Sequence, residues 1–265
     1  MASKLRLITD LYGETLTQIS KNPDDWMSFL ECAAMNYKYP FNDQVLIYAQ
    51  RPEAVACAKI EAWNKQVGRW VNRGAKGIAL LSEDNGYTNL RYVFDIADTD
   101  GSDEYIPVLV KGLAGNSEEE KNIYDNLYRV LSEKFVIQDV TGTASKGSYN
   151  LETKVISVRS DLEYLQRIKT LLHETAHAYD FTMNPDDNIP RNRRELIAES
   201  VAFVVSMRLG LDTSSYSMGY IQSWLKDKDE LKIIADTVQK VSYKIITTLA
   251  ESEGSAFSDL RESEE

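Results

Sequence analysis

The sequence predicts an α+β protein of two domains, an N-terminal α+β domain and a C-terminal domain organised around one long helix. Apolar residues recur at helical spacing in several long stretches, which is typical of amphipathic helices. Shorter apolar stretches are bounded by Asn-Gly and Asp-Gly turns, which indicates antiparallel strands. We predict domains at residues 1–115 and 116–252, followed at 253–265 by an acidic, serine-rich tail that is disordered.

The N-terminal domain begins with three predicted helices. Asn22 suits the N-cap of the second helix and Pro23 suits its first position, because proline lacks the N–H that would be unpaired there. The three helices are expected at 3–20, from Asn22 onward, and at 43–50. Strands are expected at 78–81, 90–96 and 106–110.

The C-terminal domain is expected to place two strands ahead of the long helix. Ser160 and Glu163 form a capping box, which predicts that this helix starts at 160 and ends near Thr182, before Asn184-Pro185. The other predicted elements are a helix at 117–134, strands at 135–140 and 154–158, a polar loop at 183–194, a helical stretch at 195–203 and a helix at 230–251.

Composition limits the classes of function. The net charge is −11, with 43% hydrophobic and 27% charged residues, so we expect a globular chain that does not bind nucleic acid or membrane nonspecifically as a whole. Cys32 and Cys57 lie in predicted helices and form no C-x-x-C pair, which favours buried thiols in a reducing compartment. The sequence shows neither a membrane span nor a signal core, so we expect a cytoplasmic protein without a membrane partner.

The long helix carries the motif H-E-x-x-H. His173 and His177 are the 2 histidines of the chain, and their spacing puts both rings on one helix face, where they can bind one Zn2+ ion. Glu174, beside the first histidine, is the candidate catalytic general base. The alternative is a histidine pair in the core or on a polar surface, without a metal.

A catalytic zinc site usually has three protein ligands and a water. Both cysteines lie far upstream and no third histidine exists, so we expect a carboxylate ligand. Glu195 is the preferred candidate, and Glu199, four residues further on the same helix face, is the less favoured one. With Glu195 on the metal, we expect Glu199 to hold a histidine N–H. A solvated acidic helix face is the alternative interpretation.

A basic segment at 59–78 contrasts with the acidic chain. It holds five lysines or arginines, one acid and two tryptophans, a combination typical of single-stranded nucleic acid binding. Composition alone favours the alternative interpretation, a helix-turn-strand segment with tryptophans in the core and a solvated basic face. The candidate nucleic-acid-binding residues are Lys65, Arg69, Trp70, Arg73 and Lys76.

H-E-x-x-H followed by E-x-x-A-E at 195–199 resembles the gluzincin-like metallopeptidases, and among them the ArdC-type antirestriction proteins. The segment Y-I-x-x-W-L at 220–225 is also similar to ArdC-type chains. The ImmA/IrrE regulatory peptidases, with E-x-x-A-N, are a more distant resemblance. The resemblance implies a zincin-like metallopeptidase domain, Glu195 as metal ligand, and a protein or peptide substrate.

The N-terminal half resembles the single-stranded DNA-binding domain of the same family through Trp63, Arg73-Gly74 and Lys76-Gly77, with arginine where the first lysine is usual. The segment V-F-D-I-A-D-T at 93–99 is similar to that domain's V-F-N-x-x-Q-T strand, with Asp95 and Asp98 replacing amides. These acids would repel phosphate if they were exposed. Further motifs at 36–41 and 46–52 resemble LtrC-like proteins of conjugative elements in Gram-positive bacteria.

Three hypotheses follow. The first is a zinc metallopeptidase fused to a single-stranded DNA-binding module, encoded on a mobile element with an antirestriction-like role. The second is a DNA-binding antirestriction protein whose zinc site is not proteolytic. The third is a regulatory peptidase that cleaves a repressor. If proteolysis occurs, the candidates for stabilising the oxyanion are Tyr179, Tyr216 and Tyr220.

Overall fold

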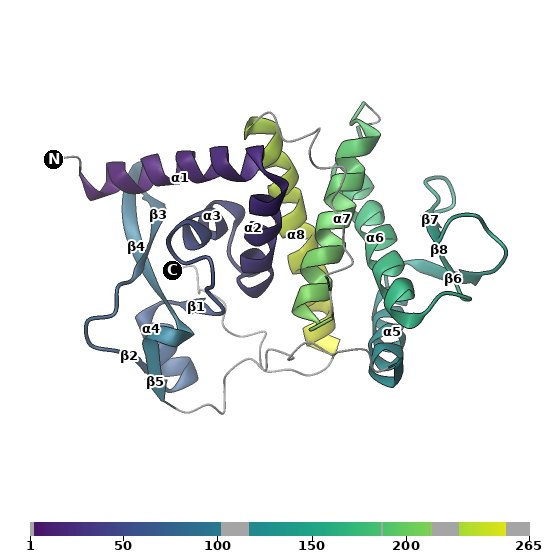
Figure 1. The fold of residues 1–265 in the computed structure, drawn as a ribbon, viewed down its shortest axis with the longest axis horizontal. Coiled ribbons are helices and arrows are strands. Elements are labelled where there is room, and N and C mark those ends of the chain that lie inside the picture. The colour runs from purple at the N-terminus through teal and green to yellow at the C-terminus, as the bar shows by residue number, and fades with distance from the viewer. Residues whose placement is uncertain (1–2, 102–116, 187, 212, 214–227, 253–265) are drawn as a thin grey trace. The chain divides into compact units, whose positions relative to one another are not determined.

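The computed structural model describes residues 3–101, 117–186, 188–211, 213 and 228–252 (Figure 1). It has the predicted mixed α+β architecture. Backbone proximity divides the chain into two compact units, one with described residues 3–101 and 228–232, the other with the rest. Several predictions lie outside the described residues: the strand at 106–110, the domain boundary at 115, Tyr216, Tyr220 and the tail.

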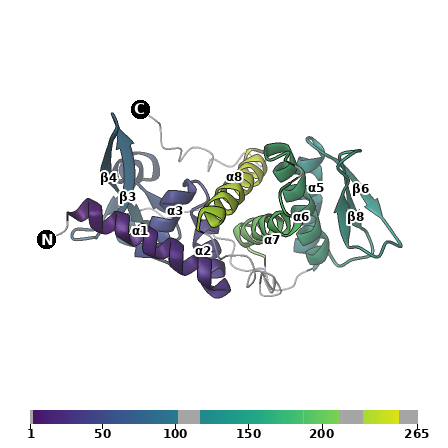
Figure 2. The same cartoon turned by 90° about the horizontal axis from the view of Figure 1, so that it is seen from above.

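The first unit opens with three helices that pack on one another: α1 (Lys4–Lys21), α2 (Pro23–Met35) and α3 (Phe41–Gln50). The predicted cap of α2 is present, because the Asn22 side chain accepts a hydrogen bond from the Asp24 N–H at 3.0 Å. Trp26 and Phe29 are buried between these helices. Figures 1 and 2 show α1 and α3 beside the hairpin of β3 (Ile78–Asp84) and β4 (Tyr87–Asp95).

The hairpin forms around Asn85 and Gly86, whose φ values of 50° and 79° suit the tight turn that the sequence predicts. β1 (Cys57–Ala58) pairs with β4, so Cys57 lies in a strand and the helix predicted there is wrong. A second sheet pairs β2 (Arg69–Val71) with β5 (Thr99–Gly101). The remaining elements are short: α4 (Ile60–Ala62), the π-helix η1 (Trp63–Val67) and the 3-10 helix η2 (Ile96–Asp98).

The second unit packs helices on a three-stranded sheet of order β6-β8-β7. β6 (Val136–Val140) is parallel to β8 (Val155–Arg159), and β7 (Gly147–Tyr149) is antiparallel to β8 at the sheet edge. α6 (Tyr164–Met183) packs against β7, β8, α5 (Ser117–Ser132) and α7 (Arg191–Arg208). α8 (Lys228–Ser252) buries Ile234, Val238, Val241 and Ile245 as a stripe, as its periodicity predicts.

Two predicted boundaries in this unit are wrong. α6 begins at Tyr164 and not at Ser160, because the Ser160 N–H and hydroxyl both bond to the Val140 carbonyl at the end of β6. Ser160 is therefore bonded to the end of β6 and does not cap α6. α7 begins at Arg191, so the predicted loop at 183–194 is shorter and its three arginines lie in the first turn of a helix.

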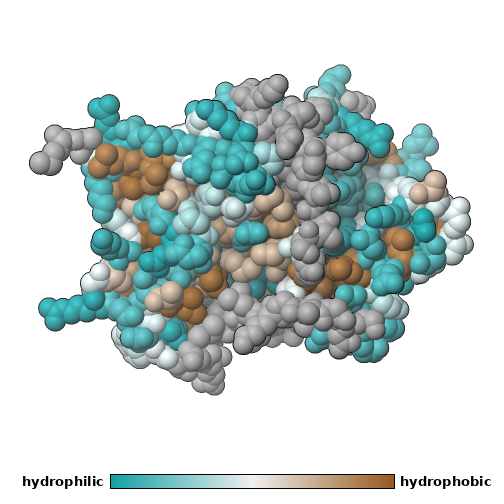
Figure 3. All heavy atoms as spheres, in the orientation of Figure 1, coloured by the Kyte–Doolittle hydropathy of each residue, from teal (hydrophilic) through white to brown (hydrophobic). Residues whose placement is uncertain are grey.

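The surface in Figure 3 carries hydrophobic residues in small separate patches among hydrophilic ones. Within the described ranges, no helix combines the length and the apolar character that crossing a membrane requires.

Candidate metal centre

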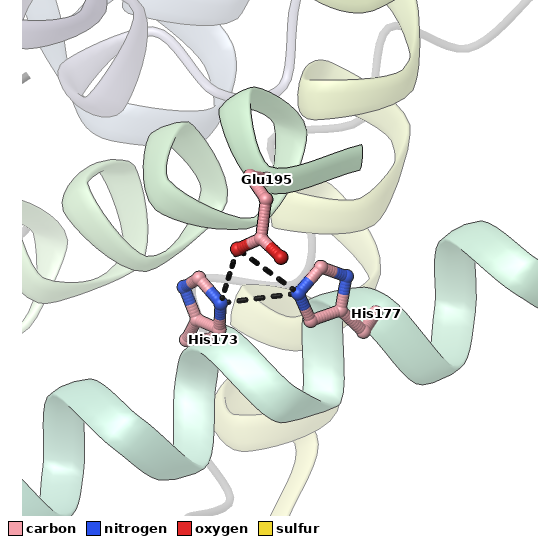
Figure 4. Close-up of side chains that lie close together, drawn as sticks. All are labelled: His173, His177 and Glu195. Atoms are coloured by element: carbon pink, nitrogen blue, oxygen red, sulfur yellow. Dashed lines mark hydrogen bonds and ion pairs between the residues drawn. The ribbon is translucent and has the colours of Figure 1, made fainter. Parts of the chain in front are cut away.

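The H-E-x-x-H motif lies in the second half of α6. The helix places Ile168, Leu172 and Ala176 in the core, each with no solvent exposure, and this apolar face sets the orientation of the remaining side chains. His173 and His177 therefore project one turn apart on the neighbouring face (Figure 4). Their Nε2 atoms lie 3.1 Å from each other.

α7 contributes the third group. Leu196, Ile197 and Val201 bury one face of α7, and α7 packs along α6, so that Glu195 projects towards the two rings (Figure 4). Glu195 Oε2 lies 3.4 Å from His173 Nε2 and 3.7 Å from His177 Nε2. The structure thus brings together the three ligands that the sequence predicts.

The three atoms fit a divalent cation. Tetrahedral zinc with metal–nitrogen distances of ~2.05 Å separates neighbouring ligand atoms by about 3.3 Å. The distances of 3.1, 3.4 and 3.7 Å lie around that value. Two imidazoles and one carboxylate, all half-buried, could hold a metal ion, and a tetrahedral ion would keep one position for a water or another group.

The carboxylates around His173 favour the protonated, positively charged form of its imidazole. Burial alone would lower the pKa of His173, but its hydrogen bonds with Glu195 and Glu199 outweigh burial and raise the pKa to about 10. The same two histidines hold the pKa of Glu195 far below its ordinary value. Glu199 Oε1 lies 3.2 Å from His173 Nδ1, behind the ring, where the sequence places it.

Glu174 lies beside the cluster and is buried, with 9% exposure. Burial raises the pKa of its carboxyl, and the two histidines and a hydrogen bond from the Tyr149 backbone partly oppose this shift. Tyr149 belongs to β7, so the sheet edge touches the candidate general base. Gly147 in the same strand permits this approach, because a Cβ there would lie 2.4 Å from Thr170 Cγ2 and 3.3 Å from Glu174 Cγ.

The structure removes Tyr179 from the oxyanion candidates. Two residues beyond His177, it lies on the opposite side of α6 from the ligands. Its ring packs edge-on against Phe135 at 5.0 Å, with Lys244 of α8 lying over it at 4.8 Å. The side chain is therefore part of the core, with 5% exposure.

In the first unit, four of the five candidate nucleic-acid-binding residues are exposed. Trp70 is 61% exposed, and Lys65, Arg73 and Lys76 lie in exposed positions of the same segment. The placement of Arg69 on the exposed basic face is corrected by the structure. Arg69 is only 7% exposed, and its guanidinium donates to the hydroxyl and the carbonyl of Thr99 at 2.8 Å. It joins β2 to β5 and does not belong to the exposed basic face.

The two acids that replace amides do not face outward as free charges. Asp95 is 2% exposed and accepts hydrogen bonds from the backbone N–H groups of Val55, Ala56 and Ala97. Asp98 pairs with the Arg51 guanidinium. Neither carboxylate is therefore an exposed and unpaired charge of the kind expected to repel phosphate.

Sequence reasoning missed Gly147 and Asp180 beside the candidate ligands, and it placed Arg194 in the polar loop predicted at 183–194. Gly147 closes a Gly-rich stretch of the sequence but lies in β7, and its approach to α6 depends on the pairing of β7 with β8. Asp180 and Arg194 are both buried, with 0% and 4% exposure. A signal for them exists, since Asp180 falls among apolar core positions of α6 and Arg194 directly precedes Glu195.

The fold and the cluster together define a class, an α+β protein in which two histidines and one glutamate form a candidate site for a divalent cation. The particular fold is similar to that of the antirestriction protein ArdC from plasmid R388. Its metal-free crystal structure covers 80% of this chain and 86% of its own, with a TM-score of 0.50 and 21% identity. Its Mn(II)-bound structure covers 80% and 85%, with a TM-score of 0.51 and 21% identity.

Sequence comparison adds a further relative. The chain is 22% identical over 291 aligned residues to pXO2-81, an uncharacterized protein of Bacillus anthracis. The alignment covers 88% of this chain and 49% of pXO2-81, so the chain spans about half the length of that curated relative. No family model matches the chain.

Proposed function

We propose that this protein is an ArdC-type antirestriction protein that binds a divalent metal ion through His173, His177 and Glu195. The observation that carries the proposal is the convergence of these three groups, from α6 and α7, in a fold that a Mn(II)-bound antirestriction protein shares. Two imidazoles and a carboxylate suit Zn2+, and they also accept Mn2+. The protein would act in the cytoplasm on behalf of a mobile element.

Metal analysis tests this proposal directly. Protein purified without chelator is expected to carry a single equivalent of metal, whereas the His173→Ala variant loses most of it because one of three ligands is gone. Lys146→Ala serves as the control, because Lys146 pairs with Gln166 on the surface of the same unit. A parent protein that takes up neither zinc nor manganese would refute the metal site.

The first unit supplies the DNA-binding part of the proposal. The exposed Trp70 ring offers a stacking surface, and Lys65, Arg73 and Lys76 offer charges for phosphates. We therefore propose that this unit binds single-stranded DNA. A fluorescence anisotropy titration with an oligonucleotide at two salt concentrations tests it, since phosphate contacts weaken as salt rises.

A metallopeptidase activity is a second candidate function, and the position of Glu174 favours it. The carboxyl directly follows His173, is buried beside the cluster and contacts the edge strand β7. A divalent cation, when bound, supplies Lewis acidity for hydrolysis. Glu174 would accept a proton from water and donate it to the leaving amine, and an extended peptide would pair with the edge strand β7.

The variant Glu174→Gln separates the two candidates. Glutamine keeps the size of the side chain but cannot accept the proton, so metal content is expected to stay at the parent's level while peptide hydrolysis is lost. Hydrolysis is measured with an unfolded generic substrate such as casein. Equal cleavage by parent and variant would rule out a Glu174-dependent peptidase.

A further inference from the structure

We infer that Asp180 and Arg194 form a positioning pair that sets the register between α6 and α7 and so places Glu195 opposite His173 and His177. The inference rests on the proposed metal-binding function. Asp180 follows His177 by three residues, and Arg194 directly precedes Glu195. A constraint between 180 and 194 therefore acts close to the ligands on both helices.

The pair is buried and closely bonded. Arg194 Nη1 donates to Asp180 Oδ2 at 2.7 Å, and the two side chains are 5% and 0% exposed. Arg194 Nη2 donates to the carbonyls of Asn184 and Asp186 at 2.9 and 2.8 Å. One guanidinium, carried by the first turn of α7, thus binds the end of α6 and the connecting loop at once.

Other side chains hold this arrangement. The Asn184 amide donates to Asp180 Oδ1 at 2.8 Å, so both oxygens of the Asp180 carboxylate have a partner. The guanidinium carbon of Arg194 lies 3.9 Å from the centre of the Phe181 ring. If one charge of this buried pair is removed, the other is left without a partner, which costs folding free energy. Substitutions at either position are therefore poorly tolerated.

The apolar contact between the helices does not set the register by itself. α6 and α7 pack on each other and each buries apolar residues, among them Leu172 and Val201, and apolar attraction has no preferred direction. A slip of one residue along α7 would turn Glu195 by about 100° around the helix axis, away from the imidazoles. A hydrogen-bonded ion pair beside the ligand resists that slip, because its partners are fixed in distance and angle.

The same helix provides a matched control. Near the start of α6, the Arg167 Nη2 donates to both oxygens of Asp139 at 2.9 Å, and the guanidinium lies 4.0 Å from the Tyr124 ring. This pair is also an arginine–aspartate pair stacked on an aromatic ring, with an 11% exposed arginine. It joins α6 to β6, however, and not to the helix that carries Glu195.

The test compares Arg194→Lys and Asp180→Asn with Arg167→Lys. Lysine keeps the charge but cannot form the fork of hydrogen bonds. We expect the first two variants to bind zinc about 10-fold or more weakly in competition with a chromophoric chelator, as is typical for residues that orient ligands. The visible absorption of the Co2+ form is expected to change in band position and intensity, whereas Arg167→Lys lowers the Tm and leaves both metal readouts at the parent's values.

The outcomes are distinguishable. If folded Arg194→Lys binds zinc as tightly as the parent and has the parent's cobalt spectrum, the positioning pair is overturned and the metal site stands. If the parent itself binds no metal, both proposals are overturned. If a single variant fails to fold, the double variant Asp180→Asn with Arg194→Gln, which leaves no unpaired buried charge, is measured in its place. Weak metal binding by that folded variant supports the inference, and parent-like binding overturns it.

Discussion

Glu199 Oε1 lies 3.2 Å from His173 Nδ1, one turn of α7 beyond Glu195, which faces the other nitrogen of the same ring. The imidazole is therefore held between two carboxylates from a single helix. When a metal ion displaces the proton from Nε2, the Nδ1–H remains directed at Glu199, because the hydrogen bond of one nitrogen sets the tautomer of the ring.

The Glu199→Gln variant is expected to weaken metal binding by about 10-fold, since a neutral amide orients the ring less strongly and makes it a poorer donor. Isothermal titration of the metal-stripped protein with Zn2+ measures the change. Glu133→Gln, an exposed acid near Arg129 on the surface, is the control and is expected to match the parent. Unchanged affinity in Glu199→Gln would show that this carboxylate plays no part in the site.

Gly147→Ala is expected to destabilise the second unit by about 1–3 kcal/mol, in the range of overpacked core positions. The added Cβ would lie 2.4 Å from Thr170 Cγ2 and 2.8 Å from the Ser157 carbonyl oxygen, and the carbonyl belongs to the neighbouring strand and cannot turn away. Urea unfolding followed by circular dichroism gives the free energy of unfolding.

Gly13→Ala is the control for this change. No atom lies within 4 Å of a Cβ built at Gly13, which sits inside α1, so alanine is expected to stabilise the protein by about 0.5–1 kcal/mol through better helix propensity. Similar effects of the two substitutions would contradict the close approach of β7 to α6.

Trp70→Ala is expected to lower the affinity for single-stranded DNA by about 1–3 kcal/mol, the usual contribution of one stacked base. The free energy of unfolding is expected to change little, since the side chain is 61% exposed. Tyr87→Ala removes another exposed aromatic residue, 74% exposed at the tip of the β3–β4 hairpin, and is expected to leave affinity unchanged. Equal losses in both variants would argue against a binding face centred on Trp70.

The two thiols are expected to react slowly in the folded protein. Burial raises the pKa of Cys32 to about 12 and also raises the pKa of Cys57, so the reactive thiolate is scarce at pH 8 and increases only as pH rises towards these values. Labelling with a disulfide reagent at pH 8, with and without urea, measures this protection. Rapid labelling of both thiols without urea would contradict it.

Local spacing was enough to predict the histidine pair. A helix of 3.6 residues per turn places positions 173 and 177 on one face whatever surrounds it, and Asn22 with Pro23 starts α2 through bonds within its own first turn. The turn at Asn85-Gly86 is local in the same sense, since its backbone angles suit these residues. Such features need no knowledge of the neighbouring elements.

Other features depend on which elements meet. Ser160 fails as a cap because Val140 of β6 binds it, and Arg69 is withdrawn from the basic face because β5 supplies its acceptors. The sequence by itself determined the α+β class, the presence of the long helices and the residue types of the candidate metal site. Only the tertiary structure decided that Glu195 reaches both rings, that Glu174 touches β7 and that Asp180 binds Arg194, because packing between distant segments sets these distances.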